Sequence, residues 1–253
     1  MLKLLKLSYL NVKNIVRSKE SILLIIGAFA YSIMWVVLVQ IRSMKSFQII
    51  DHTSEFGRFL FIVILYMSAS ILRNDIRANI TKTLFTGVFT RIEIMFSKII
   101  SLIMLSVFVS ILVEINCLLV AILRYNKMGI NEFLSLNHLQ IIITYSVVTF
   151  SMGSLMILII SIAFSESKNM LFIILFLSAI NFFNSALVVK VFREPLFIEK
   201  ISIYAKTPFY IWTDCTTSLT SGGANIYGLL IAIFYGVVFL TFSAFIINKR
   251  EIK

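Results

Sequence analysis

A few polar side chains interrupt long apolar stretches of the sequence, and they are the first candidates for chemistry. They are Glu114, Asn116, Asn181 and Asn184. If these stretches cross a bilayer, a carboxylate near its centre costs about 2.5–3.5 kcal/mol, so such a residue is a candidate for function. Glu114 could contact a transported substrate or carry a proton. Two structural alternatives remain open, since it could reach the outer headgroups or pair with Arg124.

Asn181 and Asn184 are three residues apart, so they lie on one face of a helix. Amide side chains inside a membrane commonly hydrogen-bond across helices. We therefore expect these two residues to hold helices together.

The cysteines and histidines offer little further chemistry. Cys117 and Cys215 are expected to be free thiols. His52 and His138 fall in segments predicted to be outer loops, with no second ligand at a metal-like spacing, so no metal site is expected. An intramembrane enzyme would need a nucleophile and base, paired carboxylates or a His/Glu metal set within the spans. One carboxylate and no histidine are expected there, which argues against catalysis.

The composition places these residues in a membrane protein. Of 253 residues, 59% are hydrophobic and 14% are charged, whereas soluble domains have roughly 45–50% and about 25%. Mean hydropathy is +0.97. The apolar runs do not alternate with polar residues, so they predict helices rather than barrel strands.

The whole chain, residues 1–253, is predicted to be a single all-α transmembrane domain with six spans. Arg58 and Arg73 are expected to reach the two interfaces at the ends of the short second span. The spans are expected near 21–41, 58–73, 97–123, 139–164, 169–189 and 226–247.

The net charge of +11 does not indicate nucleic-acid binding, because the basic residues lie at the ends of apolar runs rather than on one soluble face. Lys and Arg are denser in the segments before the first span and between the second and third. This bias predicts that both termini are cytoplasmic.

Two segments outside the spans have their own predicted structure. Residues 1–20 predict an amphipathic interfacial helix, although a flexible basic segment that orients the first span is the alternative. Residues 190–225 are rich in apolar and aromatic side chains and predict short extracellular helices at the outer leaflet. The apolar stripe of the first segment is Leu2, Leu5, Tyr9, Val12 and Val16.

The predicted cytoplasmic loop, residues 74–96, contains the most informative spacing. Thr90 and Glu93 have capping-box spacing, which predicts that the third membrane helix starts there. Upstream, Ile80, Leu84 and Phe85 give a short helix an apolar face. Such a face needs a partner surface, or else the segment lies on lipid headgroups.

The stretch from Gly87 to Lys98, with Thr90-Arg91, Glu93-Ile94 and Lys98 opening an apolar span, resembles the loop of ABC-2 (type V exporter) membrane subunits. The family pattern is Pro-Val-Ser-Arg-x-Glu-Ile followed by Gly-Lys. Gly87 and Ser97 depart from it, which puts the geometry of the turn in doubt. The six spans, the N-terminal helix and the elaborated segment before the last span are also similar to that family.

The resemblance implies a permease whose coupling helix, near Thr81–Phe85, contacts a separate P-loop ATPase. This chain has no phosphate-binding loop of its own, so ATP and Mg²⁺ belong to the partner and the chain is not itself an enzyme. A second permease copy or a related chain, and membrane lipids, are the other expected partners. The coupling residues implied are Thr81, Leu84, Phe85, Gly87, Thr90, Arg91, Glu93 and Lys98.

The narrower resemblance is to permeases that export amphipathic or antimicrobial peptides, including staphylococcal phenol-soluble modulin exporters. It implies a cell-membrane location in a Gram-positive bacterium and a role in peptide export or immunity. A secondary carrier or channel, and less favourably an intramembrane enzyme, are the alternatives.

Overall fold

The chain is a bundle of long helices. A computed structural model describes residues 2–42, 44, 47–77, 90–124, 129–163 and 170–249, and these ranges contain helices and no β-strand. Six helices are long and apolar enough to cross a membrane, as expected for a multi-pass membrane protein. They are α2 (Lys19–Ile41), α3 (Ile49–Arg77), α5 (Arg91–Leu123), α7 (His138–Ala163), α8 (Met170–Arg193) and α11 (Ile226–Lys249).

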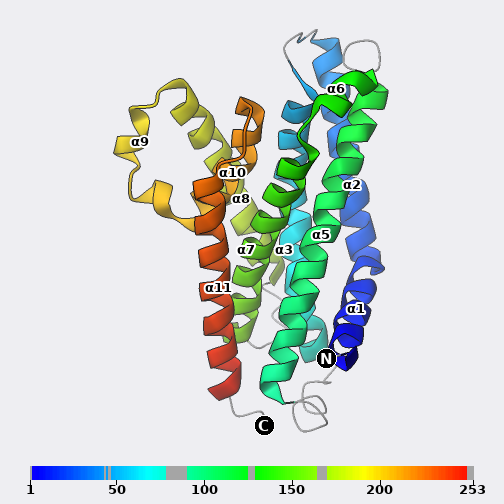
Figure 1. Cartoon of the computed structure of the whole chain (residues 1–253), viewed down its shortest axis with the longest axis vertical. Coiled ribbons are helices and arrows are strands. Elements are labelled where there is room, and N and C mark those ends of the chain that lie inside the picture. Colours follow the sequence, from blue (N-terminus) through cyan, green and yellow to red (C-terminus); the bar gives the residue numbers. More distant parts are fainter. Residues whose placement is uncertain are drawn as a thin grey trace.

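The first turn of α1 (Leu2–Val16) and the last turn of α11 lie at the same end of the bundle (Figure 1). We call this the proximal end, and the opposite end, where α2 finishes and α3 begins, the distal end. Six crossings require the two termini to share a side. Which side faces the cytoplasm stays a prediction.

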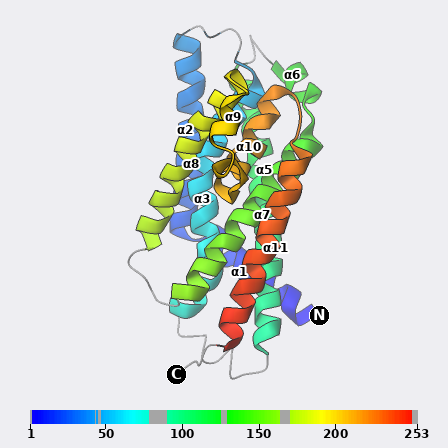
Figure 2. The ribbon, with the colours of Figure 1, turned by 90° about the vertical axis from the view of Figure 1, so that its left-hand side faces the viewer.

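Helix α1 lies across the proximal end rather than along the bundle axis (Figure 2). It packs against α5 and α3 through a face that includes the buried Ser8 and Ile15. Leu5 and Tyr9, from the predicted apolar stripe, are exposed instead. The predicted stripe is therefore divided, because Val12 and Val16 are half-buried and Val16 packs against the core of the bundle.

Helix α3 is the span most covered by protein, with α2, α5, α7 and α8 packed around it. It begins at Ile49, well before residue 58, so the helix extends beyond the apolar run that predicted the second span. Asp51 and Glu55 lower the local hydropathy, but Ile49 and Phe56 are fully buried and hold this polar first part in the bundle. Arg58, expected at an interface, instead pairs with Glu55 within the helix at 2.9 Å.

A small residue lets three helices meet near the middle of the bundle. A Cβ atom added at Gly153 of α7 would lie 2.3 Å from Leu102 Cδ1 of α5 and 2.7 Å from Ser68 Oγ of α3. Such close approach through small residues is typical of membrane helices. Lipid tails are as apolar as the helix surfaces, so these helices associate through close packing rather than through the hydrophobic effect.

The segment between α8 and α11 folds into short helices, and its predicted extracellular position stays a prediction. Tyr204 donates a hydrogen bond to Asn184 of α8, and Tyr235 of α11 donates one to the Lys206 carbonyl at 2.8 Å. By the helical rise, Asn184 and Tyr235 each lie about 14 Å from the distal ends of their helices. The short helices are α9 (Phe197–Lys200), η1 (Tyr204–Lys206), α10 (Pro208–Ser218) and η2 (Leu219–Ser221).

The segment therefore dips along one side of the bundle, with α9 outermost, before α10 carries the chain back to the distal end (Figure 1). Helix α10 packs against α8, α11 and α7, and Trp212 donates a hydrogen bond to Ser151 of α7 at 2.9 Å. Ser151 lies about 20 Å along α7 from its distal start. A short helix, α6 (Gly129–Ser135), caps the distal end between α5 and α7.

We predict that Gly153→Ala destabilises the bundle by about 1–3 kcal/mol, because the new methyl group overpacks the junction of α3, α5 and α7. The matched control is Gly27→Ala in α2, where a Cβ would lie 3.5 Å from the Phe59 ring, an ordinary contact. Thermal unfolding in detergent measures both. Equal melting temperatures for the two variants would contradict the tight packing at Gly153.

A second prediction concerns the half-buried Asp214 of α10. Burial raises the pKa of its carboxyl group, and the hydrogen bond from Asn225 Nδ2 (2.7 Å) opposes this only in part. Because the folded protein binds this proton more tightly than the unfolded chain does, the carboxyl's contribution to stability falls as pH rises through the raised pKa.

Asp214→Asn should therefore raise the melting temperature at pH 7, and the gain should shrink as the pH falls into the carboxyl range. The exposed Glu199→Gln is the control. A gain that is independent of pH would argue against a buried ionised carboxylate.

Candidate functional site

The start of α5 has the predicted capping box. The Glu93 amide donates to Thr90 Oγ1 at 3.3 Å, and Glu93 Oε2 accepts from the Thr90 amide at 2.8 Å. These bonds satisfy two backbone donors that a helix N-terminus leaves open. The helix therefore begins at a defined residue, Arg91, and the spacing in the sequence predicted this correctly.

Arg91 joins this helix start to the end of α11. Its Nη1 donates to the Asn248 carbonyl at 2.9 Å and to the Ile247 carbonyl at 3.4 Å. These are among the last carbonyls of α11, where a helix end leaves acceptors unpaired and favours positive charge. The sequence indicated Arg91 as a coupling residue but did not indicate this contact with the last span.

Lys98 is buried and forms an ion pair with Asp75 near the end of α3. Its side chain is 3% exposed and that of Asp75 is 17% exposed. A buried ammonium group is tolerated only with a partner. Asp75 was not among the predicted site residues, although it is an acidic residue in a basic segment just after an apolar run, which could have indicated a partner.

A seam of small polar side chains attaches α1 beside this ion pair. Ser8 Oγ donates to the Ser97 carbonyl at 2.9 Å, and Asn11 Nδ2 donates to the Ile71 carbonyl at 3.3 Å. Ser101 Oγ lies 3.5 Å from Asn11 Nδ2. Helix α1 is therefore hydrogen-bonded to both α3 and α5 next to the place where they are joined by charge.

Four predicted coupling residues, Thr81, Leu84, Phe85 and Gly87, lie outside the described residues. The other four, Thr90, Arg91, Glu93 and Lys98, all lie in or beside the proximal part of α5. These last four, with Asp75, form what we call the α3–α5 base, the structure from which the connection between the two helices departs.

At the distal end, Glu114 pairs with His138 across α5 and α7, with 2.7 Å between Oε2 and Nδ1. The suggested pairing of Glu114 with Arg124 is wrong, because Arg124 faces α3. Arg124 Nη1 donates to the Phe47 carbonyl at 3.2 Å and to His52 Nε2 at 2.7 Å. A guanidinium is only a donor, so Nε2 is the acceptor and the neutral ring carries its proton on Nδ1.

The expected placement of both histidines in loops is also wrong. His52 is buried in the first turns of α3, and His138 is the first residue of α7. Two of the helices that could cross a membrane therefore begin with a histidine in their first turn, which weakens one argument against catalysis. Among the described residues, however, neither ring is hydrogen-bonded to a thiol or hydroxyl group that it could activate.

The remaining polar candidates divide into paired and unpaired groups. Asn181 accepts a hydrogen bond from Thr213 of α10 at 2.6 Å, and Asn184 accepts one from Tyr204. Both thus join α8 to the dipping segment rather than to another span. Asn116 is fully buried in α5, and neither its Nδ2 nor its Oδ1 has a partner among the described residues.

Both cysteines are buried free thiols, as expected. Cys117 Sγ lies 3.1 Å from Thr53 Oγ1, between α5 and α3, and Cys215 is in α10 rather than in a loop. Among the described residues, no group of three or more His, Cys, Asp or Glu side chains could hold a metal ion.

The sequence matches no known protein-family model and no curated protein. The resemblance to ABC-2 subunits therefore stays a prediction from the stretch between Gly87 and Lys98 and from the order of the helices.

We predict that Asp75→Ala lowers the free energy of unfolding by about 3–5 kcal/mol, because it leaves Lys98 buried without a partner. The double variant Asp75→Leu with Lys98→Met, which removes both charges, should be clearly more stable than the single variant. Unfolding in mixed micelles measures both. A double variant as unstable as Asp75→Ala would show that the ion pair is not what the site requires.

Proposed function

We propose that this chain is the membrane-spanning subunit of an ATP-driven exporter of the ABC-2 type, with the proximal end in the cytoplasm of a bacterial cell. Its cargo would be amphipathic or antimicrobial peptides. A separate P-loop ATPase would bind ATP and Mg²⁺, and a second permease subunit, either a copy of this chain or a related one, would complete the pathway.

The observation that supports the proposal most is that ion-pair and hydrogen-bond contacts join the α3–α5 base to the neighbouring helices. The connection between the two helices leaves one helix just after Asp75 and enters the other just before Arg91, and Asp75 and Lys98 join the two helices. Arg91 extends the joint to α11, and the serine seam extends it to α1. A push on this connection would therefore reach four helices at once, as an ATPase-driven switch requires.

A peptide cargo fits the chemistry of the lipid-facing surface better than a small hydrophilic solute does. Helix α8 exposes Phe172, Phe176 and Phe183, and α11 exposes Phe234 and Phe242. Aromatic, uncharged faces of this kind suit a cargo that partitions into the bilayer. A secondary carrier or channel is the alternative, and an intramembrane enzyme is the less favoured one.

The test is purification of the full-length tagged chain from its native membrane in mild detergent, followed by mass spectrometry. A P-loop ATPase in stoichiometric amount is the expected result, with ATPase activity stimulated by amphipathic peptides. A chain without any ATPase, also after cross-linking, would contradict the proposal and favour the carrier or enzyme alternatives.

Phe85→Asp should reduce the peptide-stimulated ATPase activity to its basal rate. A charge on the apolar face of the proposed coupling segment, near Thr81–Phe85, would weaken the binding of this segment to the ATPase. Asn79→Asp adds the same charge at a polar position of the same segment and is the control. Stimulation retained in Phe85→Asp would remove Phe85 from the coupling contact.

A further inference from the structure

The outward face of α1 carries a stripe of basic side chains, formed by Lys6, Lys13 and by Arg17 in the turn after the helix. At about 100° per residue the three positions lie within about 40° of one another. Ser8 and Ile15, which are buried against the bundle, lie on the opposite side of the helix. Lys6 and Arg17 are exposed and Lys13 is half-buried. This basic stripe therefore points away from the bundle.

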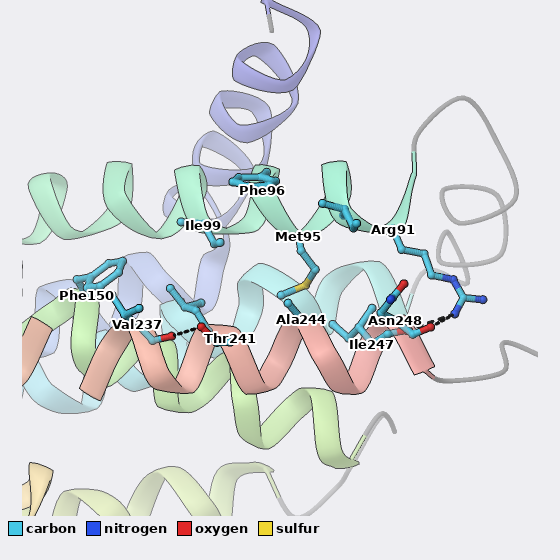
Figure 3. A pocket seen from close by; sticks show the side chains of 12 residues that line it. Arg91, Met95, Phe96, Ile99, Phe150, Val237, Thr241, Ala244, Ile247 and Asn248 are labelled. Carbon is cyan, nitrogen blue, oxygen red and sulfur yellow. Dashed lines mark hydrogen bonds between the residues drawn. The ribbon is translucent and has the colours of Figure 1, made fainter. Parts of the chain in front are cut away.

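The charge of the basic stripe is not neutralised within the described part of the chain, where none of its three side chains forms an ion pair. Helix α1 has no acidic residue, and the nearest one along the chain is Glu20 in the first turn of α2. Other cations at the proximal end are engaged within the protein. Lys98 pairs with Asp75, and Arg91 binds the end of α11 beside an apolar groove between α5 and α11 (Figure 3).

Hydrogen bonds fix the depth of α1 relative to the spans. They go to the carbonyls of Ser97 in α5 and Ile71 in α3. By the helical rise, these residues lie about 2 Å from Lys98 and about 6 Å from Asp75 along their helices. Charged residues of this kind mark the proximal limits of the apolar runs of α3 and α5, which is where a hydrocarbon core ends. Helix α1 therefore lies at the level of the lipid headgroups.

One flank of the basic stripe is apolar. Leu5 and Tyr9 are 38% and 57% exposed, and both lie within about 100° of Lys6 around the helix. Basic side chains beside an apolar and aromatic flank are typical of a helix that lies in the membrane interface, with its cations among the phosphates. A soluble acidic protein would have to displace lipid to reach this depth, so headgroups are the favoured partner.

We propose that the basic stripe of α1 binds the phosphate groups of anionic phospholipids in the proximal leaflet and gathers these lipids beside the α3–α5 base. Each Lys or Arg near an anionic surface strengthens binding by about fivefold. An interfacial position alone would not select a class of lipid, whereas three unpaired cations on one face do. This surface is independent of the proposed export function.

The test uses the full-length protein with a fluorophore on Asn14→Cys, an exposed position of α1. Both native cysteines are buried, so the label goes to this position. The vesicles contain phosphatidylcholine with about one tenth phosphatidylglycerol, and a trace of either lipid carries a spin label that quenches the fluorophore on contact. Spin-labelled phosphatidylglycerol should quench about threefold more strongly than spin-labelled phosphatidylcholine, and 1 M salt should remove the difference.

Variants of exposed residues separate this surface from the general charge of the proximal end. Lys6→Gln alone should lower the preference for phosphatidylglycerol about twofold, and the triple variant Lys6→Gln, Lys13→Gln and Arg17→Gln should abolish it. Lys6→Arg with Lys13→Arg keeps the charge and should keep the preference. Lys249→Gln removes one charge from the exposed last turn of α11, at the same end, and should behave as the parent protein.

Equal quenching by the two lipids in the parent protein would overturn the proposal. A preference retained in the triple variant, or lowered as much by Lys249→Gln as by Lys6→Gln, would also overturn it. Quenching by neither lipid would place the face in water, where a soluble acidic partner is the alternative.

Discussion

The position of α3 governs the arrangement of the other spans. Lipid is as apolar as the helix surfaces, so helices associate through close packing and hydrogen bonds rather than by exclusion from water. Helix α3 offers both, because it is covered by protein along most of its length and carries polar groups near its two ends. Gly153 of α7 lets α5 and α7 approach it closely.

The two polar ends of α3 are each joined to α5 by a charged side chain. Asp75 meets Lys98 at the proximal end, and His52 meets Arg124 at the distal end. A buried charge without a partner is strongly unfavourable, so these contacts oppose sliding of the two helices. Helices α3 and α5 are thus joined at both ends, and Arg91 joins the end of α11 to them.

Helix α8 is attached differently. Its hydrogen bonds to the dipping segment, through Asn181 and Asn184, lie in its distal half, whereas Leu171, Phe172 and Phe176 in its proximal half are exposed. The proximal half of α8 also packs on the bundle through the buried Met170 and Ile174, without hydrogen bonds of this kind.

The sequence by itself determined the class of protein and those features that depend on neighbouring residues. Apolar runs long enough for a bilayer identified six spans, and the spacing of Thr90 and Glu93 identified the start of α5. Hydropathy did not indicate that the helix α3 includes residues 49–57, because the helix there is stabilised by burial against other helices rather than by its own composition.

Only the tertiary structure decided which polar residues meet. Asp75 with Lys98, Arg91 with the end of α11, and Glu114 with His138 are pairs between different helices. Nothing in the spacing of one helix specifies the rotation and height of another. The same reason applies to the apolar groove between α5 and α11. Its walls come from α5, α7 and α11, and the sequence predicts each of these helices only as a span.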